Sequence, residues 1–303
     1  MHGSVIFAAT AMTMILSAEP QIRCVNFYGL ETERMNFVCD WVNHPHYFVD
    51  KLIEDIDLTT FRVPFSHDFL KEGNLTILDE FVFMCDKHNL SIILDWHRTH
   101  KTHQGYGPLQ EVSLSEFIST WLWLLHRYNE SRSVQGVGIF NEYQGTATAA
   151  VLEYSVPLIQ EIEAMFPRRF YYFVGCPGWG GDCSSMGVLL TLDEWERTFV
   201  EVHKYIFSGT DWDQSIPVEI PATHWFVGET GWKQDQQAWG DRFFDYLKKR
   251  NITNVCFWTI AHSGDTEGLW NDDCHNIYPK KLDTLRRFWN ISSPGALPAN
   301  DTL

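Results

Sequence analysis

"ILDEFVFMCDKHNLSIILDWH", residues 77–97, is the stretch that decides the fold. Its first part, 77–89, carries apolar residues at helical spacing, and its second part, 91–97, is an apolar run that ends in Trp and His. Such a run is typical of a parallel strand that is buried on both faces. The stretch therefore predicts a helix that is followed directly by a buried strand.

The same unit recurs along the chain. Strand-like runs lie at 22–28, 60–64, 91–97, 135–141, 170–175, 199–205, 224–229 and 254–259. Helical patterns lie between most of them or after the last, at 47–56, 77–89, 113–129, 148–166, 237–251 and 280–290. The fifth run is followed by a short helix at best, and the connection after the sixth run looks irregular.

Eight such units in a chain of 303 residues predict a single-domain (β/α)₈ barrel of the α/β class. An open, doubly wound sheet is the alternative. It requires a Gly-rich phosphate loop after the first strand, and "NFYGLETE" (26–33) is not such a loop.

Composition narrows the class of partner. The formal net charge is −16, which argues against nucleic acid or an anionic membrane, because phosphate binding requires clustered Lys and Arg. The 13 Trp residues are a high number, and Trp often lines sugar-binding grooves, although we expect most of them to pack in the core.

The N-terminal region predicts export. Residues 4–18, "SVIFAATAMTMILSA", form an apolar run that is too short to span a bilayer comfortably and resembles a signal peptide cleaved near Ala18. The alternative is a buried N-terminal segment. Six Asn-x-Ser/Thr sequons favour passage through a eukaryotic secretory route, and they start at Asn74, Asn89, Asn129, Asn251, Asn290 and Asn300.

Seven cysteines leave at least one thiol unpaired within the chain. Cys176 and Cys183 flank the loop "CPGWGGDC" and can close it as a disulfide, and Cys39 with Cys274 is a second candidate pair. No Cys/His spacing is typical of a zinc site. Two further cysteines lie inside apolar strand-like runs, where we expect them to pack as small hydrophobic residues: Cys24 and Cys256.

Polar side chains stand at the ends of several predicted strands, where the active sites of (β/α)₈ barrels lie. Glu142 ends the fourth strand and Glu229 the seventh, so the two should face each other across the barrel mouth. Two such carboxylates suit glycoside hydrolysis if their pKa values differ. The other strand-end residues are Arg62, His97, Asn141, His203, Tyr205 and Trp258.

Each of three of these residues has a more common explanation when it is taken singly. An arginine such as Arg62 more often forms a salt bridge in the barrel, a histidine such as His97 more often only ends a strand, and a tryptophan such as Trp258 more often packs in the core. The complete order is more specific. It resembles glycoside hydrolase family five, the cellulase family of the clan of retaining (β/α)₈ glycosidases. The resemblance covers residues 22–290 and rests on "VNFYGLET" (25–32), "RVPF" (62–65), "LDWH" (94–97), "FNEY" (140–143), "VHKY" (202–205), "GETG" (228–231) and "CFWT" (256–259). One departure is Tyr143, where the family often has Pro.

The resemblance implies that Glu229 is the nucleophile and that Glu142 is the acid and then the base. Arg62 and Tyr205 would hold the nucleophile, and Asn141 would bind the sugar 2-hydroxyl. The resemblance also implies that His203 tunes the acid and that His97 bonds substrate or nucleophile. It implies that the ring of Trp258 stacks on the sugar.

Two further groups lie in predicted loops. The first is five aromatic residues that are candidates for sugar subsites: Trp41, Tyr106, Trp179, Trp232 and Trp270. The second is His100 and His103, which follow His97 at a spacing of three. They lack a neighbouring carboxylate in the sequence, so we expect groove residues and no metal site.

These inferences predict a signal peptide over 1–18, a catalytic barrel over 19–293 and a flexible tail over 294–303. The predicted function is a secreted, monomeric, retaining endo-β-1,4-glucanase that acts on a β-linked polysaccharide or oligosaccharide without metal or organic cofactor. A hydrolase of β-mannan, β-1,3-glucan or xyloglucan with the same two Glu is the first alternative. A non-catalytic carbohydrate-binding barrel is the second.

Overall fold

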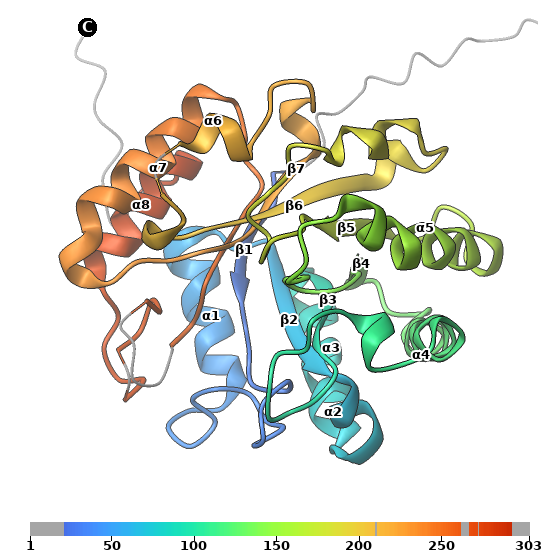
Figure 1. Cartoon of the computed structure of the whole chain (residues 1–303). Helices are drawn as coiled ribbons and strands as arrows, with labels where there is room; N and C mark the ends of the chain where they lie inside the picture. Colours follow the sequence, from blue (N-terminus) through green and yellow to red (C-terminus); the bar gives the residue numbers. More distant parts are fainter. Residues whose placement is uncertain (1–20, 210, 262–266, 272, 293–303) are drawn as a thin grey trace, which may run out of the picture.

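Eight parallel strands form a closed barrel in the computed structural model, which describes residues 21–209, 211–261, 267–271 and 273–292. The strands pair in sequence order, and the last pairs with the first (Figure 1). This confirms the predicted (β/α)₈ architecture. The strands are β1 (Arg23–Asn26), β2 (Thr60–Ser66), β3 (Ser91–Arg98), β4 (Val134–Gly138), β5 (Tyr171–Gly175), β6 (Thr198–Lys204), β7 (Trp225–Thr230) and β8 (Val255–Phe257).

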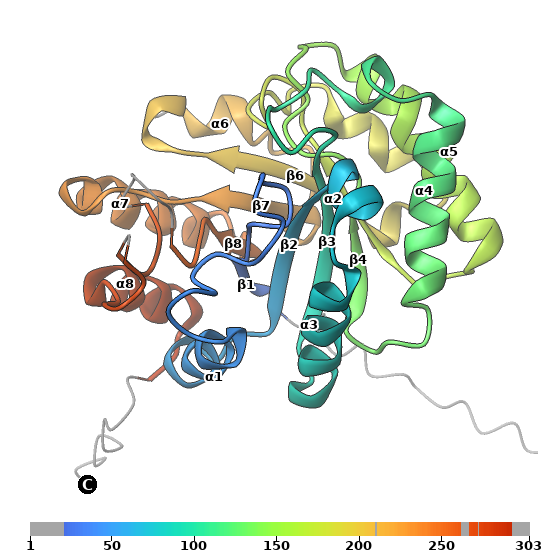
Figure 2. The same ribbon diagram turned by 90° about the horizontal axis from the view of Figure 1, so that it is seen from below.

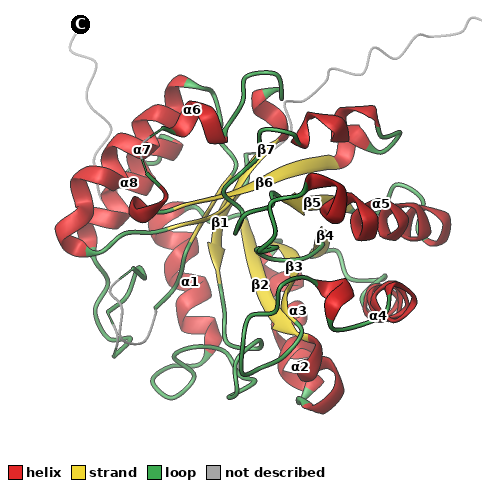
Figure 3. Ribbon diagram, viewed as in Figure 1, coloured by secondary structure: helices red, strands yellow, loops and turns green. Residues whose placement is uncertain are grey.

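Helices surround the strands, as Figure 3 shows in the same view and Figure 2 after a turn of 90°. The connection between β5 and β6 holds two 3₁₀ turns, and the one between β6 and β7 holds a four-residue helix flanked by 3₁₀ turns. Both agree with the prediction. The helices are α1 (Pro45–Ile56), α2 (His67–Glu72), α3 (Leu75–His88), α4 (Leu114–Arg127), α5 (Thr148–Met165), α6 (Trp212–Ser215), α7 (Gln237–Lys249) and α8 (Pro279–Trp289).

Polar residues set the helix ends. The Ser113 hydroxyl accepts a hydrogen bond from the backbone N–H of Glu116 and starts α4. Asn74 caps the start of α3 in the same way. Asn89 and Asn290 end α3 and α8 in the left-handed conformation, which Asn adopts more readily than most residues.

The barrel interior is layered because alternate side chains of a strand point inward. On β3, Ile93, Asp95 and His97 point into the barrel at successive levels. The lowest level is apolar and contains Cys24, Ile93, Phe173, Phe199, Phe226 and Cys256. Trp96 points the other way and packs against Phe117 and Trp121 of α4.

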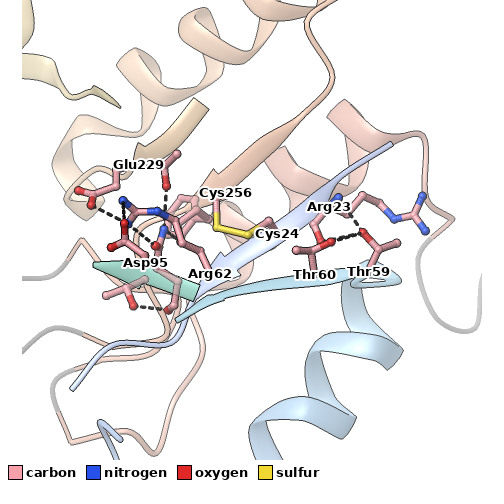
Figure 4. Close-up of a disulfide and its surroundings, with 12 residues drawn as sticks. Arg23, Cys24, Thr59, Thr60, Arg62, Asp95, Glu229 and Cys256 are labelled. Carbon is pink, nitrogen blue, oxygen red and sulfur yellow. Dashed lines mark hydrogen bonds and ion pairs between the residues drawn. A yellow bond between two sulfur atoms is a disulfide. The ribbon is translucent and has the colours of Figure 1, made fainter. Parts of the chain in front are cut away.

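Three disulfides link the chain. Cys39–Cys274 and Cys176–Cys183 confirm the predicted pairs, and Cys85 in α3 is the buried free thiol. The prediction for Cys24 and Cys256 was wrong: they form a disulfide across the β1–β8 seam (Figure 4). The two residues are direct register partners, which only the closure of the barrel brings together over a sequence separation of 232.

The predicted signal peptide, 1–18, and the predicted tail, 294–303, both lie outside the described residues. Within the described ranges, no helix has the length and apolarity that crossing a lipid bilayer requires.

Loop length predicts how much each bridge stabilises the fold. With Cys24–Cys256 intact, Cys39–Cys274 closes only the short segments beyond that seam, so the variant Cys39→Ser/Cys274→Ser should lower the free energy of unfolding by about 3–4 kcal/mol. Cys176–Cys183 has a sequence separation of only 7, and removing it should have a smaller effect of about 2 kcal/mol. Urea unfolding measures both, and a larger effect for the short loop would contradict this ranking.

Candidate active site

The predicted polar residues converge at the carboxyl end of the barrel. Glu142 follows β4, and His203 and Glu229 lie on β6 and β7; one ligand atom of each lies within 4.8 Å of the other two. The remaining predicted residues contact this group or its neighbours, and all of them are buried: Arg62, His97, Asn141, Tyr205 and Trp258.

Arg62 is the centre of the site and is fully buried. Its Nη1 donates to Glu229 Oε1 at 3.0 Å, and its Nη2 contacts Asp95 Oδ1 at 3.0 Å (Figure 4). Burial opposes the charge of the guanidinium, but the facing carboxylates outweigh it and raise the pKa of Arg62. Its other partners are Asn26 Oδ1 at 3.0 Å, Asn141 Oδ1 at 2.7 Å and Glu201 Oε1 at 2.9 Å.

Sequence reasoning missed two of these carboxylates, Asp95 and Glu201. Each lies two residues before a predicted site histidine on the same strand, so both point inward one level below the barrel mouth. That spacing was the available signal. Burial raises the pKa of Asp95 against the charge of Arg62; for Glu201 burial also acts upward, but Arg62 and His203 prevail and lower the pKa.

Glycines make room for these two carboxylates. A Cβ atom on Gly138 of β4 would lie 2.9 Å from Asp95 Oδ1, and one on Gly228 of β7 would overlap Oε1 of Glu201. Only a residue without a side chain leaves space for the charged level of the interior at these two strands.

Glu229 is held by two hydrogen bonds and one longer ion-pair contact. Arg62 donates to Oε1, the Tyr205 hydroxyl donates to Oε2 at 2.9 Å, and His203 Nδ1 lies 3.6 Å from Oε2. Burial raises the pKa of Glu229, and the charge of Glu142 adds to this, whereas His203 and Arg62 lower it. The predicted contacts with Arg62 and Tyr205 are therefore present, and two cations oppose the neutral form of this acid.

His203 lies between Glu142 and Glu201. Nδ1 lies 3.1 Å from Glu142 Oε1 and Nε2 lies 3.2 Å from Glu201 Oε1, so both ring nitrogens face carboxylate oxygens. Burial alone would lower the pKa of His203, but Glu229, Glu142 and Glu201 together raise it to about 10. The imidazole is therefore a cation at neutral pH, as a ring that donates from both nitrogens must be.

His97 is a neutral imidazole. The Asn141 carbonyl oxygen accepts from Arg62, so the Asn141 amide nitrogen is the donor to His97 Nε2 at 3.3 Å. The proton of His97 is then on Nδ1, 2.8 Å from Asp95 Oδ2. Burial, with the charges of Arg98, Arg62 and His203, keeps the pKa of His97 well below its ordinary value.

Glu142 lies on a backbone that few residues adopt. Its φ is +47°, in the left-handed region that favours glycine, and such conformations gather at functional sites. The loop 176–183 supports Tyr143, the residue that follows Glu142: the backbone N–H of Trp179 donates to the carbonyl of Tyr143 at 3.0 Å. The same loop accepts the backbone N–H of His203 on the carbonyl of Gly180 at 2.9 Å.

The aromatic predictions were partly wrong. Trp232 and Trp270 are 0% and 1% exposed and belong to the core, where they pack against Phe257 and Phe48. Trp258 is 9% exposed, and one side of its ring stacks on His97. Three of the predicted aromatics expose about half or more of their surface and remain candidates for sugar contacts: Trp41, Tyr106 and Trp179.

A cavity lies at the amino-terminal end of the barrel. It has a volume of about 710 Å³ and is lined by residues such as Thr60, Ile93, Tyr171 and Phe199. These residues lie at or near the starts of β2, β3, β5 and β6, whereas the charged cluster lies at the carboxyl ends of the strands, so this cavity and the cluster occupy opposite mouths of the barrel.

Comparisons with known proteins agree with this geometry. The chain matches the family model Cellulase (glycosyl hydrolase family 5) over residues 18–264. The catalytic domain of the major endoglucanase from Xanthomonas campestris pv. campestris has 18% identity and a TM-score of 0.73, with 89% of this chain and 95% of that chain covered. A hyperthermophilic endocellulase from the archaeon Pyrococcus horikoshii has 18% identity and a TM-score of 0.73, with 89% and 93% covered.

A complex of the Pyrococcus horikoshii endocellulase with cellotetraose has 17% identity and a TM-score of 0.74, with 89% of this chain and 92% of that chain covered. At such low identities the three structures establish only that the barrel fold is shared. The relationship in sequence rests on the match to the family model.

The glycine that faces Glu201 gives a test of the charged level. In Gly228→Ala the new methyl group must displace the carboxylate that joins Arg62 to His203, so we expect the free energy of unfolding to fall by about 2–4 kcal/mol. Gly187→Ala is the matched control, because its Cβ would meet no atom within 4 Å. Urea unfolding of both variants decides the matter, and equal stabilities would mean that Glu201 moves without loss.

The pKa of His203 predicts a pH dependence. A pKa raised from 6.5 to about 10 contributes stability that is fully present below pH 6.5 and is lost as the pH rises towards 10. The stability difference between the native protein and His203→Asn should therefore shrink across this range, by an amount on the order of a few kcal/mol. Urea unfolding at several pH values measures this difference.

Two comparisons make that test specific. Burial lowers the pKa of the neighbouring Lys204 to about 8, but Lys204 is present in both proteins, so the difference removes its titration. His126→Asn, which replaces an exposed imidazole, is the matched control for the substitution itself. A constant difference for His203→Asn would show that the buried ring carries no charge.

Proposed function

This chain belongs to glycosyl hydrolase family 5, the cellulase family, and is a glycosidase; we propose that it is a retaining endoglucanase that cleaves β-linked glucan chains by double displacement. The observation that carries the proposal is the pair of carboxylates at the barrel mouth. An oxygen of Glu142 lies within 4.8 Å of an oxygen of Glu229. Retaining glycosidases hold their two carboxyl groups about 5–5.5 Å apart, whereas inverting enzymes leave room for a water between them.

Glu229 is the nucleophile in this proposal. Arg62 and His203 favour its carboxylate form, and the hydrogen bonds from Arg62 and Tyr205 fix both oxygens, so one of them can attack the anomeric carbon. The ester that forms removes a negative charge from the cluster. Arg62 keeps its other carboxylates in this step, so the cluster stays paired.

Glu142 is the acid and then the base. It is the more exposed of the two carboxyl groups, with 21% of its side chain accessible against 5% for Glu229. It can therefore reach the glycosidic oxygen and later a water molecule. Its contact with His203 supplies a cation that can hold the carboxylate formed after the proton has left.

Asn141 and Trp258 bind the sugar in this proposal. The Asn141 amide nitrogen gives one hydrogen to His97 and has a second for the 2-hydroxyl of the substrate. The part of Trp258 that His97 does not cover can contact the apolar face of a pyranose ring. The acidic surface of the protein suits a neutral substrate, and the structural neighbours include endoglucanases and a cellotetraose complex.

We also propose that the protein is secreted. Three disulfides are typical of an oxidising compartment, and they support the export predicted from the apolar N-terminal run. The side chains of four sequon asparagines are exposed and accessible to a glycan: Asn74, Asn89, Asn251 and Asn290.

Substituting each glutamate tests the proposal. Glu229→Gln should reduce hydrolysis of a soluble β-1,4-glucan by more than about 10⁴-fold, because no covalent intermediate can form. Glu142→Gln should release the aryl group of a glycoside with a good leaving group in a burst, since that group departs without a proton, and should then turn over slowly because the base for the second step is missing. Glu130→Gln, at an exposed surface position, is the control and should match the native rate.

The anomeric form and size of the products decide the finer points. Proton NMR of the native reaction should show the β-anomer first, and oligosaccharides of several lengths should appear early. An α-anomer as first product would overturn the retaining mechanism. Faster hydrolysis of β-mannan or xyloglucan than of β-1,4-glucan would move the proposal to that polysaccharide.

A further inference from the structure

A second group of imidazole and carboxylate side chains lies beside the candidate active site, in the loop between β3 and α4. His100, His103 and Glu111 each offer one ligand atom, and these three atoms lie within 4.8 Å of one another. His103 Nε2 is 3.8 Å from Glu111 Oε1, and the two imidazole rings stack with centroids 4.9 Å apart. This carboxylate could not be associated with the histidines from the sequence, because Glu111 lies eight residues beyond His103 and reaches it only through the fold of the loop.

The outer nitrogen of each imidazole already has a partner. Nδ1 of His103 lies 3.1 Å from the Thr102 hydroxyl, and Nδ1 of His100 lies 3.6 Å from Asp68 Oδ2. Both rings therefore direct Nε2 away from these partners and are free to use it as a ligand. Histidines that bind metals usually hold their second nitrogen against a carboxylate or another oxygen in this way, which fixes the ring and its tautomer.

Glu111 supplies an independent sign of a missing partner. Only 14% of its side chain is accessible, and its Oε2 atom is buried without a hydrogen bond among the described residues. A buried carboxylate oxygen without a partner is unfavourable, and a bound cation would satisfy it. The carboxylate is packed against Gly105, where a Cβ atom would overlap it, so it cannot easily turn toward solvent on that side.

From these contacts we propose that His100, His103 and Glu111 bind one divalent transition-metal ion of the zinc class, with water as the fourth ligand. Two imidazole nitrogens and one carboxylate oxygen are a ligand set that Zn²⁺ favours, whereas Ca²⁺ and Mg²⁺ require mostly oxygen ligands. Zinc bonds of about 2.0–2.2 Å require the three atoms to approach one another by roughly 1 Å. His103 can make this movement because its side chain is exposed.

The ion would brace the loop against the catalytic residues. Gln104, between the ligands, donates to the carbonyls of His97 at 3.1 Å and Asn141 at 3.4 Å. The next residues are tied to the segment after Glu142, because Gln144 donates to the carbonyls of Gly105 and Tyr106. A metal that fixes 100–111 therefore fixes one wall beside the glutamate pair without taking part in the chemistry.

Direct metal titration tests the proposal. The full chain is dialysed against a chelator and then titrated with ZnCl₂ at pH 7.5 by isothermal calorimetry, with Co²⁺ as a second probe whose absorption bands report coordination geometry. We expect one tight site per chain and the bands of four-coordinate Co²⁺. His103→Ala and Glu111→Gln should each weaken binding at least tenfold, and Asp68→Asn should weaken it about tenfold through His100.

His46→Ala is the matched control. It removes an exposed imidazole from another stacked pair, His44 and His46, which has His88 nearby and could bind metal nonspecifically. It should leave the affinity unchanged. The proposal is overturned if Zn²⁺ shows no saturable binding, if His103→Ala and Glu111→Gln bind as the native protein does, or if His46→Ala weakens binding as much as they do. Melting curves of the metal-free variants confirm that each is folded.

Discussion

One buried guanidinium organises the upper half of this barrel. Arg62 contacts three carboxylates, those of Asp95, Glu201 and Glu229, and none of them could remain ionised at this depth without a cation. The favourable energy of such a cluster comes less from each pair than from the penalty of breaking it, because any partner that is removed leaves an unpaired buried charge. This requirement explains why glycine faces two of these carboxylates, Gly138 beside Asp95 and Gly228 beside Glu201.

A second cation, His203, divides the acidic groups into two environments. On one side it reaches Glu201 and Glu229, which are buried and held by several donors. On the other side it reaches Glu142, which stands on an unusual backbone conformation at the rim and is more accessible to solvent. Two chemically identical side chains are thereby placed in different surroundings: Glu229 is fixed in position between two cations, and Glu142 is accessible at the mouth of the barrel, as the proposed roles require.

The sequence was informative where a residue type and its position along a strand are sufficient. Apolar runs that end in polar residues identified the eight strands and every member of the predicted site, from Arg62 to Trp258. It was less informative on groups whose partners come from elsewhere in the fold. Asp95 and Glu201 lie inside apolar runs, Cys24 meets Cys256 only at the closing seam, and Glu111 reaches His103 only through the shape of a loop. Trp232 and Trp270 were misassigned because loop position alone does not tell which way a large ring turns.

The three disulfides have two different structural roles: two close the barrel, and one fixes a loop beside the candidate active site. Cys24–Cys256 and Cys39–Cys274 tie the beginning of the barrel to its end. Cys176–Cys183 spans a few residues and clamps the loop whose backbone holds Tyr143 and His203 in place. A mild reductant that opened only this small ring would leave the scaffold intact but release the loop that holds Tyr143, the neighbour of the proposed acid Glu142. If the proposed site is the active site, loss of turnover and loss of the fold are therefore separable events that depend on different sulfur–sulfur bonds.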